Sequence, residues 1–324
     1  MGTARNTEIP YPGTARALIC GSVAYDTIMV YPGEFKDHIL PDKIHMLNVS
    51  FLVPELRREF GGCAGNIAHN LKLLGGEGVP MGTVGHDFGP YADWMELRGI
   101  DDRHIRRLDK AFTAQAYITT DLKDNQITAF HPGAMNLSHL NRVPSDGGFT
   151  IGIVSPDGRR GMLEHAAQFA DLGIPYMFDP GQGLPMFDGE ELTGFVDRAS
   201  WVTVNDYEAE LLQQRTGLAP GEIARRVKAL VITRGGDGSI VFIDGRRLEI
   251  PAARPARIED PTGCGDAYRA GLLYGLMHEM DWETTGRLAS LMGAIKIESP
   301  GTQNHTFTVE SFRARFKENF AYDF

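Results

Sequence analysis

A glycine-rich turn near the carboxyl end of the sequence places an acidic side chain at the start of a predicted helix. Residues 260–271 read Asp-Pro-Thr-Gly-Cys-Gly-Asp-Ala-Tyr-Arg-Ala-Gly. Glycines such as Gly263 and Gly265 let the backbone approach an anion closely, and the amides of a helix N-terminus point toward that anion. Asp266 can then accept the proton of a hydroxyl group that attacks a phosphate. An acidic residue in a first helical turn also stabilises the helix itself, so the glycine spacing leaves both roles open.

A second small-residue segment, Gly-Gly-Cys-Ala-Gly-Asn at residues 61–66, opens a helical pattern that ends before a glycine pair. Gly61 and Gly62 permit close approach of a substrate, and the Asn66 amide can donate and accept hydrogen bonds with hydroxyl groups. Asp26 lies just beyond the first apolar run, where open α/β sheets commonly bind ligands. The alternatives are a tight helix entry with a surface asparagine, and a solvated loop or capping role for Asp26.

Two further motifs lie between these segments. Asn205 begins an Asn-Asp-Tyr-Glu sequence that ends at Glu208, and Thr233 begins Thr-Arg-Gly-Gly-Asp-Gly, which contains Gly235 and Gly238. By themselves, the first is typical of a helix start with an acidic first turn, and the second of an ordinary hairpin connection. The sequence has neither a Walker A motif nor a Gly-x-Gly-x-x-Gly after the first strand, which disfavours a P-loop enzyme and an NAD-dependent oxidoreductase.

Short apolar runs with helical segments between them must position these motifs. The runs predict buried strands at residues 17–20, 149–154, 176–178, 201–204 and 230–233. Helical spacing lies between them, as at Ile67, Leu71 and Leu74. Alternation of strands and helices predicts an α/β fold in which a mostly parallel sheet is covered on both faces.

Two stretches interrupt this alternation. Residues 25–52 and 112–131 are rich in β-forming segments, and two such insertions can pack together as a small sheet that closes over an active site. The sequence contains no internal repeat and no long low-complexity linker. We therefore expect one main domain over residues 17–324 with an inserted lid, preceded by a loosely ordered leader at residues 1–16.

The composition restricts the classes of partner. The 324 residues carry a formal net charge of -10, which argues against a large basic surface for nucleic acid or an anionic membrane. The three cysteines lack Cys-x-x-Cys spacing, which fits a reducing compartment and disfavours a zinc site. No stretch approaches the roughly 18 apolar residues of a membrane helix. We expect a soluble, cytoplasmic protein that binds small molecules, and both a monomer and a homodimer are compatible with the sequence.

The order and separation of these motifs resemble those of the ribokinase-like, or PfkB, carbohydrate kinase family over essentially the whole ordered length. Residues 61–66 match its N-terminal signature, and residues 260–266 match its C-terminal one. The resemblance implies a three-layer α/β/α fold with a small β-sheet lid. It also implies that Asp266 is the catalytic base, and that the turn at Gly263, Cys264 and Gly265 forms an anion hole for the transferring phosphoryl group.

The same resemblance implies contacts to ATP and magnesium. The implied ATP-binding residues are Asn205, Thr233, Gly235, Gly238, Gly263 and Gly265. Glu208 is expected to hold Mg²⁺ through a water molecule, and ATP is the phosphate donor that the family normally uses. The segment 299–304 matches a C-terminal loop that lies near the nucleotide in relatives and sometimes near a monovalent cation, which leaves potassium dependence open.

Substrate contacts are implied in the same way. The expected residues are Asp26, Gly61, Gly62 and Asn66, which would hold the hydroxyl groups of a ribose. Residues 124–135 look like the lid segment of prokaryotic adenosine and nucleoside kinases, where Phe130 and Met135 would give apolar surface to a base and Gln126 a polar contact. The alternative is that Phe130 and Met135 only pack the lid sheet or a subunit interface.

The leading interpretation is therefore an ATP-dependent nucleoside kinase that converts adenosine to AMP by phosphorylating its 5′-hydroxyl group. A ribokinase, fructokinase or other sugar kinase is the alternative, because these enzymes share the catalytic residues. A non-catalytic nucleoside or sugar sensor is a third, and the presence of Asp266 with its glycine turn argues against it. Pro261 and Cys264 replace commoner small or hydroxyl residues of the signature, but they leave the base and the backbone amides in place.

Overall fold

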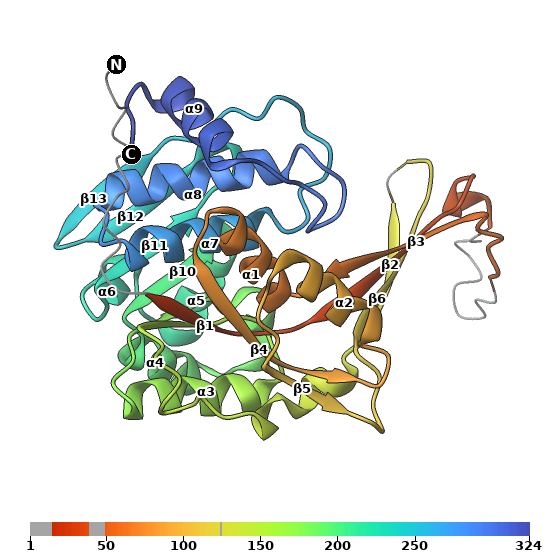
Figure 1. Cartoon of the computed structure of the whole chain (residues 1–324), viewed down its shortest axis with the longest axis horizontal. Coiled ribbons are helices and arrows are strands. Elements are labelled where there is room, and N and C mark those ends of the chain that lie inside the picture. Colours follow the sequence, from red (N-terminus) through yellow and green to blue (C-terminus); the bar gives the residue numbers. More distant parts are fainter. Residues whose placement is uncertain (1–14, 39–48, 124) are drawn as a thin grey trace, which may run out of the picture.

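A nine-stranded sheet forms the centre of the computed structural model, which describes residues 15–38, 49–123 and 125–324 (Figure 1). In spatial order its strands are β13 (Arg246–Ile250), β12 (Ser239–Ile243), β11 (Ala229–Thr233), β10 (Trp201–Asn205), β9 (Tyr176–Phe178), β8 (Ile151–Val154), β1 (Arg16–Cys20), β4 (Glu77–Gly85) and β5 (His104–Leu108). The strands from β11 to β5 are parallel, and β12 and β13 form an antiparallel edge. The predicted mostly parallel sheet is confirmed, and each of the five predicted strands is present.

Helices cover both faces of this sheet. One face carries α1 (Cys63–Leu73), α2 (Gly89–Arg98), α7 (Cys264–Met277) and α8 (Trp282–Lys296), and the other carries α3 (Arg159–Asp171), α4 (Gly189–Arg198), α5 (Asp206–Thr216) and α6 (Pro220–Ala224). Successive strand side chains point to opposite faces, so Ile19 enters the first core while Leu18 and Cys20 enter the second. The last helix, α9 (Val309–Phe320), packs Phe312 and Phe316 against α8. The result is a three-layer α/β/α domain.

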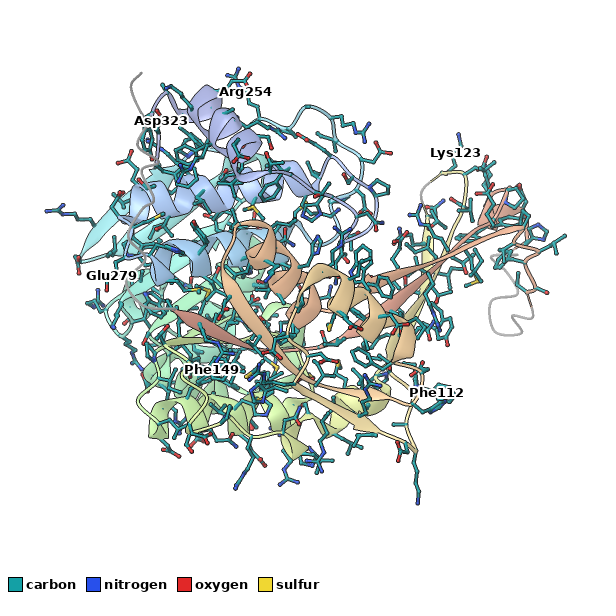
Figure 2. The ribbon with its side chains drawn as sticks, in the orientation of Figure 1. Phe112, Lys123, Phe149, Arg254, Glu279 and Asp323 are labelled. Carbon is teal, nitrogen blue, oxygen red and sulfur yellow. The ribbon has the colours of Figure 1, made fainter. Side chains whose placement is uncertain are left out.

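A smaller four-stranded sheet projects from one side of this domain. Its spatial order is β3 (Glu55–Gly61), β2 (Ala24–Val30), β6 (Ala114–Thr120) and β7 (Gln126–His131). Figure 2 shows Lys123 at the outer end of the β6–β7 hairpin and Phe112 at its base beside the main domain. We call these four strands the lid sheet.

The lid strands depart in one place from the predicted segments. The range 112–131 contains β6 and β7, but the range 25–52 ends before β3 begins at Glu55. Residues 55–61 read Glu-Leu-Arg-Arg-Glu-Phe-Gly, and the strand is mostly exposed, so it lacks the alternating apolar pattern that marks a half-buried strand. Residues 39–48 of the first range lie outside the described part of the chain.

The predicted boundary of the leader also shifts. Residues 1–14 lie outside the described part of the chain, and β1 begins at Arg16, inside the predicted leader. Among the described residues, no helix is long and apolar enough to cross a membrane.

Candidate active site

The carboxyl ends of the parallel strands meet along one edge, where the strand order changes direction. From β1 the chain continues through β4 and β5 on one side of the sheet, whereas β8, β9, β10 and β11 follow on the other. Ligands of open α/β sheets bind at such a switch point. The residues directly after β1, β8 and β9 are polar or small and include Ser22, Ser155 and Asp179. The N-termini of α1 and α7 lie at this edge, because the Ser22 hydroxyl accepts from the first amide of α1 and Asp179 contacts α7.

The turn before α7 is held in place by hydrogen bonds. Gly263 has a φ of 80°, and a Cβ atom there would lie 3.0 Å from the Thr302 side chain, so a glycine is needed at this position. The Asp260 carboxylate accepts from the Thr262 and Gly301 backbone amides, each at 2.8 Å. The first amides of a helix have no intrahelical acceptor. This turn therefore presents fixed amides and the positive end of α7 to any anion that binds.

Asp266 lies in the first turn of α7 and meets Asn66 from α1. Asn66 Nδ2 donates to Asp266 Oδ2 at 2.8 Å, so the two signature segments, 200 residues apart in sequence, are in direct contact. Burial raises the pKa of Asp266 to about 6, an effect that the hydrogen bond from Asn66 partly offsets. Such a carboxyl group is mostly ionised at neutral pH and remains basic enough to accept a proton from a hydroxyl group.

The α1 segment is a tight helix entry, but its asparagine is not at the surface. Gly62 has a φ of 84°, and Ser22 accepts from the Cys63 amide through its hydroxyl group at 3.1 Å. Asn66 is 3% exposed, and its oxygen accepts a hydrogen bond from Gln303. The alternative of a surface asparagine is therefore wrong, and the Asn66 oxygen already has a partner.

Asp26 lies in β2 of the lid sheet rather than in a loop or a helix cap. Its carboxylate packs on Gly61, where a Cβ atom would lie 2.6 Å from Asp26 Oδ2. Burial raises the pKa of Asp26 to about 6, and the negative charges of Glu59 and Asp260 add to this effect. The alternative of a solvated loop residue is wrong, and Asp26 lies close to both the lid strand β3 and the turn before α7.

The three predicted contacts to a base lie in different places. Asp26 is paired with Ala116, and Ala116 with Phe130, so Phe130 lies on the Asp26 face of the lid sheet and is 52% exposed. Gln126 lies on this face too, but four residues further out, about 13 Å along the strand. Met135 is half-buried in the 3-10 helix η3 (Gly133–Leu140), which packs mainly on α3 and β4 of the main domain and also contacts the lid strand β6.

The predicted nucleotide contacts lie at the ends of β10 and β11. Asn205 and Thr233 are direct partners in the parallel pairing of these strands. Asn205 caps α5, because its side chain accepts from the Glu208 amide at 2.7 Å and Glu208 Oε2 accepts from the Asn205 amide at 2.8 Å. Gly235 and Gly238 connect β11 to β12, in and directly after the 3-10 helix η5 (Gly235–Asp237). The helix start and the hairpin connection considered as alternatives are therefore both present, and neither prevents contact with a nucleotide.

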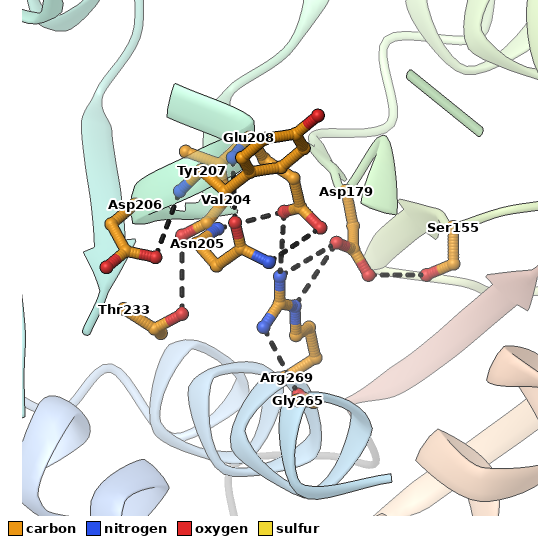
Figure 3. Close-up of polar contacts among 10 residues, drawn as sticks. All are labelled: Ser155, Asp179, Val204, Asn205, Asp206, Tyr207, Glu208, Thr233, Gly265 and Arg269. Carbon is orange, nitrogen blue, oxygen red and sulfur yellow. Dashed lines mark hydrogen bonds and ion pairs between the residues drawn. The ribbon is translucent and has the colours of Figure 1, made fainter. Parts of the chain in front are cut away.

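A buried arginine, Arg269, links the first turns of α7 to residues at the ends of the central strands, as Figure 3 shows. Arg269, which is 5% exposed, donates to Asp179 Oδ1 through Nη2 at 3.0 Å and lies 3.9 Å from Glu208 Oε2. Ser155 donates to the second oxygen of Asp179 at 3.2 Å. Arg269 also donates to the Gly265 carbonyl at 3.4 Å. This network ties the first turns of α7 to the ends of β8, β9 and β10.

Arg269 and Asp179 are functional residues that the sequence did not predict. Arg269 lies inside the segment 260–271, and Asp179 directly follows the apolar run 176–178. An acidic residue directly after a predicted buried strand was the available signal for Asp179. The sequence contains no signal that pairs it with a residue 90 positions away.

A buried lysine lies behind the same turn. Lys296, at the end of α8, is fully buried, and its ammonium donates to the carbonyl oxygens of Asp260 at 2.7 Å and Ser299 at 3.1 Å. The carbonyls belong to the turn before α7 and to the loop that contains residues 299–304. A fixed positive charge therefore already links the two segments.

Comparison with known proteins places this site in a family. Residues 22–308 match the model of the pfkB family carbohydrate kinases. A curated nucleoside kinase from Methanocaldococcus jannaschii is 28% identical over 274 residues, which are 84% of this chain and 90% of that protein. The structure of Burkholderia thailandensis nucleoside kinase in complex with inosine is 51% identical, covers 95% of this chain and 99% of that one, and gives a TM-score of 0.86. The same protein in complex with ADP-inosine is 52% identical, covers 95% and 97% of the two chains, and gives a TM-score of 0.84.

Proposed function

Because this chain belongs to the pfkB family of carbohydrate kinases, which are phosphotransferases with a hydroxyl acceptor, we propose that it phosphorylates the 5′-hydroxyl group of a nucleoside with ATP. The observation that carries the proposal is the contact between Asn66 and Asp266 at the N-terminus of α7. This contact joins a buried proton acceptor to a preformed anion site. Such a pair is what transfer of a phosphoryl group to a hydroxyl group needs.

In the proposed reaction, each charge that develops meets a fixed group of the protein. Asp266 accepts the proton of the hydroxyl group as its oxygen bonds to the γ-phosphorus and the bond to the ADP oxygen breaks. The amides at Gly263, Cys264 and Gly265 offset the negative charge of the transferring group. Arg269 holds these amides in position through its hydrogen bond to the Gly265 carbonyl. The carboxylate of Asp179 neutralises the positive charge of Arg269.

The proposed acceptor is a nucleoside, with adenosine as the leading substrate and AMP as its product. The Asp26 carboxylate can accept hydrogen bonds from two neighbouring hydroxyl groups of a ribose, and Phe130 offers an exposed ring on the same face of the lid sheet. The Burkholderia nucleoside kinase, which is 51% identical, binds inosine. This similarity supports purine nucleosides as the substrate class and makes inosine the first competitor of adenosine.

Magnesium fits this site as an ion bound mainly to the nucleotide. Among the described residues, no group of three or more His, Cys, Asp and Glu side chains is placed to hold a metal ion. Mg²⁺ commonly keeps several water ligands and binds through one or two carboxylates and substrate phosphates. The Glu208 carboxylate, whose side chain is 13% exposed beside Arg269, is suited to bind such a water ligand. The bound ion would neutralise part of the phosphate charge.

We also propose that the lid sheet closes over the nucleoside. Asp26 and Gly61 lie on its strands at the end nearest Asp266, while Gln126 lies at the opposite, outer end of β7. Gln126 is therefore placed to contact the base only when the lid moves toward the main domain. Closure would also exclude water from the phosphoryl transfer.

A panel of acceptors tests this proposal. Formation of ADP from Mg-ATP is measured with adenosine, inosine, guanosine, cytidine, ribose and fructose, and the phosphorylated product is identified. Turnover of purine nucleosides to 5′-monophosphates supports the proposal. Turnover of ribose or fructose alone would assign the enzyme to the sugar kinases, and binding without ADP formation would make it a nucleoside sensor.

A further inference from the structure

A hydrogen-bonded chain of side chains lies behind Asn66 and has no role in the mechanism above. It consists of the buried Gln303 and Tyr91 and the half-buried Trp94. Gln303, which follows α8 and is 2% exposed, accepts from Trp94 Nε1 through Oε1 at 3.0 Å. Gln303 Nε2 donates to Asn66 Oδ1 at 2.9 Å and to the Tyr91 hydroxyl at 2.6 Å. Tyr91 in turn donates to the Gly61 carbonyl at 2.8 Å. The chain therefore runs from α2, through Gln303, to the asparagine that contacts Asp266.

Trp94 fixes the direction of every hydrogen bond in this chain. An indole nitrogen can only donate, so the Gln303 oxygen must face Trp94 and the Gln303 NH₂ group must face Asn66. Asn66 then turns its oxygen toward Gln303 and its NH₂ group toward Asp266. Tyr91 imposes the same direction, because its proton goes to Gly61 and its oxygen must accept from Gln303.

The direction matters because the two faces of the Asn66 amide have opposite effects on Asp266. A donor toward the carboxylate stabilises its ionised form, and this hydrogen bond lowers the pKa of Asp266 against the raising effect of burial. A flipped Asn66 amide would place its oxygen against a carboxylate oxygen of Asp266. Both oxygens are acceptors, so a hydrogen bond could form between them only if Asp266 were protonated. A protonated Asp266 cannot accept the proton of the substrate.

We propose that Gln303, oriented by Trp94, is a positioning residue that keeps the donor side of the Asn66 amide toward Asp266. The inference rests on the proposed function only in taking Asp266 as the base. Gln303 touches neither substrate nor phosphate in this account and acts through Asn66. Its contribution is to hold the base ionised in the free enzyme.

Two variants test the hydrogen-bonded chain behind Asn66 at different points. Gln303→Met keeps the length of the side chain but removes both the donor and the acceptor, and Trp94→Phe removes only the indole donor. Loss of a hydrogen bond to a carboxylate raises the pKa of that carboxyl group by about one pH unit. We expect the pKa of Asp266 to rise by about one pH unit in Gln303→Met and by less in Trp94→Phe.

The matched control is Tyr268→Phe. It removes a buried hydrogen bond of 2.6 Å to Ser239 from the same helix, α7, but leaves the chain behind Asn66 intact. This variant is expected to lower stability without moving the titration of Asp266. It therefore separates a positioning role from a general loss of stability.

The titration is measured in two ways. One is the acidic limb of the pH profile of kcat/KM, and the other is the ¹³C shift of the Asp266 carboxyl group, assigned with the Asp266→Asn protein. A rise in the pKa of Asp266 in Gln303→Met and in Trp94→Phe, with no change in Tyr268→Phe, supports the inference. An unmoved carboxyl titration in Gln303→Met, or in Trp94→Phe should Gln303→Met fail to fold, overturns it. If no nucleoside is turned over but the carboxyl titration moves, the proposed function fails and the positioning role stands.

Discussion

Two carboxyl groups with raised pKa values lie at the centre of the site. Burial raises the pKa of Asp266 and that of Asp26 to about 6. Both values exceed the ordinary value of an aspartate, so protonation occurs close to the pH at which the enzyme is expected to work. The proposed roles require both groups to be ionised, one to accept a proton and the other to hold ribose hydroxyl groups. The activity should therefore be lost toward acid pH rather than toward alkaline pH.

The pH profile of kcat/KM is the corresponding measurement. We expect a level profile above about pH 7 and a steep fall below about pH 6, close to a hundredfold for each pH unit once both groups are protonated. Asp26→Asn cannot ionise, so its profile should fall by only about tenfold for each pH unit, from a lower maximum. A wild-type profile that stays level to about pH 4 would contradict the assignment of Asp266 as the base.

At the scale of secondary-structure elements, the site depends on how firmly α7 is fixed to the sheet. The Arg269–Asp179 pair is almost fully buried, with side chains 6% and 4% exposed. Removing one partner of a buried ion pair leaves the other charge uncompensated. The resulting loss in the free energy of unfolding exceeds the net contribution of the intact pair. The pair therefore makes the position of the anion site sensitive to single substitutions that do not touch the substrate.

A double-mutant cycle tests this dependence. Arg269→Met and Asp179→Asn are each expected to lower the free energy of unfolding by about 3 kcal/mol. The double variant should lose less free energy of unfolding than the sum of the two single losses, because Asp179 no longer leaves an uncompensated carboxylate. Urea denaturation of the four proteins gives these values. Strictly additive losses would show that the two side chains do not act as a pair.

The buried ammonium of Lys296 bears on potassium dependence. It lies 2.7 Å and 3.1 Å from the carbonyl oxygens of Asp260 and Ser299, and Ser299 begins the segment 299–304 for which the sequence left potassium dependence open. A second cation at the same carbonyls would be repelled by this charge. We therefore expect kcat and KM to be unchanged when potassium chloride is replaced by tetramethylammonium chloride at equal ionic strength.

Lys296→Met is the control for that measurement. It leaves the two carbonyl groups without a cation, so its turnover should fall in both salts or become dependent on potassium. A strong requirement of the wild-type protein for potassium would mean that a cation binds elsewhere, and would refute the role given to Lys296.

For the molecule as a whole, the proposed function requires two sheets to come together around the substrate. The main sheet and its helices hold Asp266, Asn66 and the proposed nucleotide contacts, whereas the lid sheet holds Asp26 and Phe130. The lid sheet projects from the side of the main domain (Figure 1), and every residue of its edge strand β7 is exposed. Such an edge has few contacts to protect its backbone amides from exchange.

Hydrogen exchange measures lid closure directly. We expect a bound nucleoside to slow amide exchange several-fold in β6 and β7, because closure would bury the Asp26 face of the lid sheet. Exchange in α9, which packs on α8 away from the lid, serves as the internal control and should not change. Equal exchange in β6 and β7 with and without nucleoside would contradict the proposed lid.

The sequence predicted the main sheet well because its central strands are continuous apolar runs. It did not predict β4, whose residues Gly78, Pro80 and Gly82 are turn-forming in other settings, although the strand is buried between β1 and β5. In this case tertiary packing outweighs local preference: a Cβ atom on Gly82 would lie 2.9 Å from the Gly21 carbonyl. β5, β12 and β13 were likewise not predicted.

Within the site, local signatures located the glycine turns but not the side chains that orient them. The contacts of Gln303 with Asn66, of Lys296 with Asp260 and of Asp179 with Arg269 span 237, 36 and 90 positions of the sequence. Spacing along the chain carries no information on such contacts. The segment around Gln126 was identified by its resemblance to a family. Its sequence did not predict that Gln126 lies at the outer end of β7, because that position depends on the geometry of the sheet.

The most direct test of the account compares the wild-type protein with Asp266→Asn at about pH 7.5, where the wild-type carboxyl group is ionised. Calorimetry measures binding of ATP and of inosine or adenosine, and ADP formation measures turnover. We expect both ligands to bind the variant within a few-fold of the wild-type affinity, while kcat falls by at least about a hundredfold. Turnover of the variant at close to the wild-type rate would contradict the central claim that Asp266 accepts the proton of the substrate.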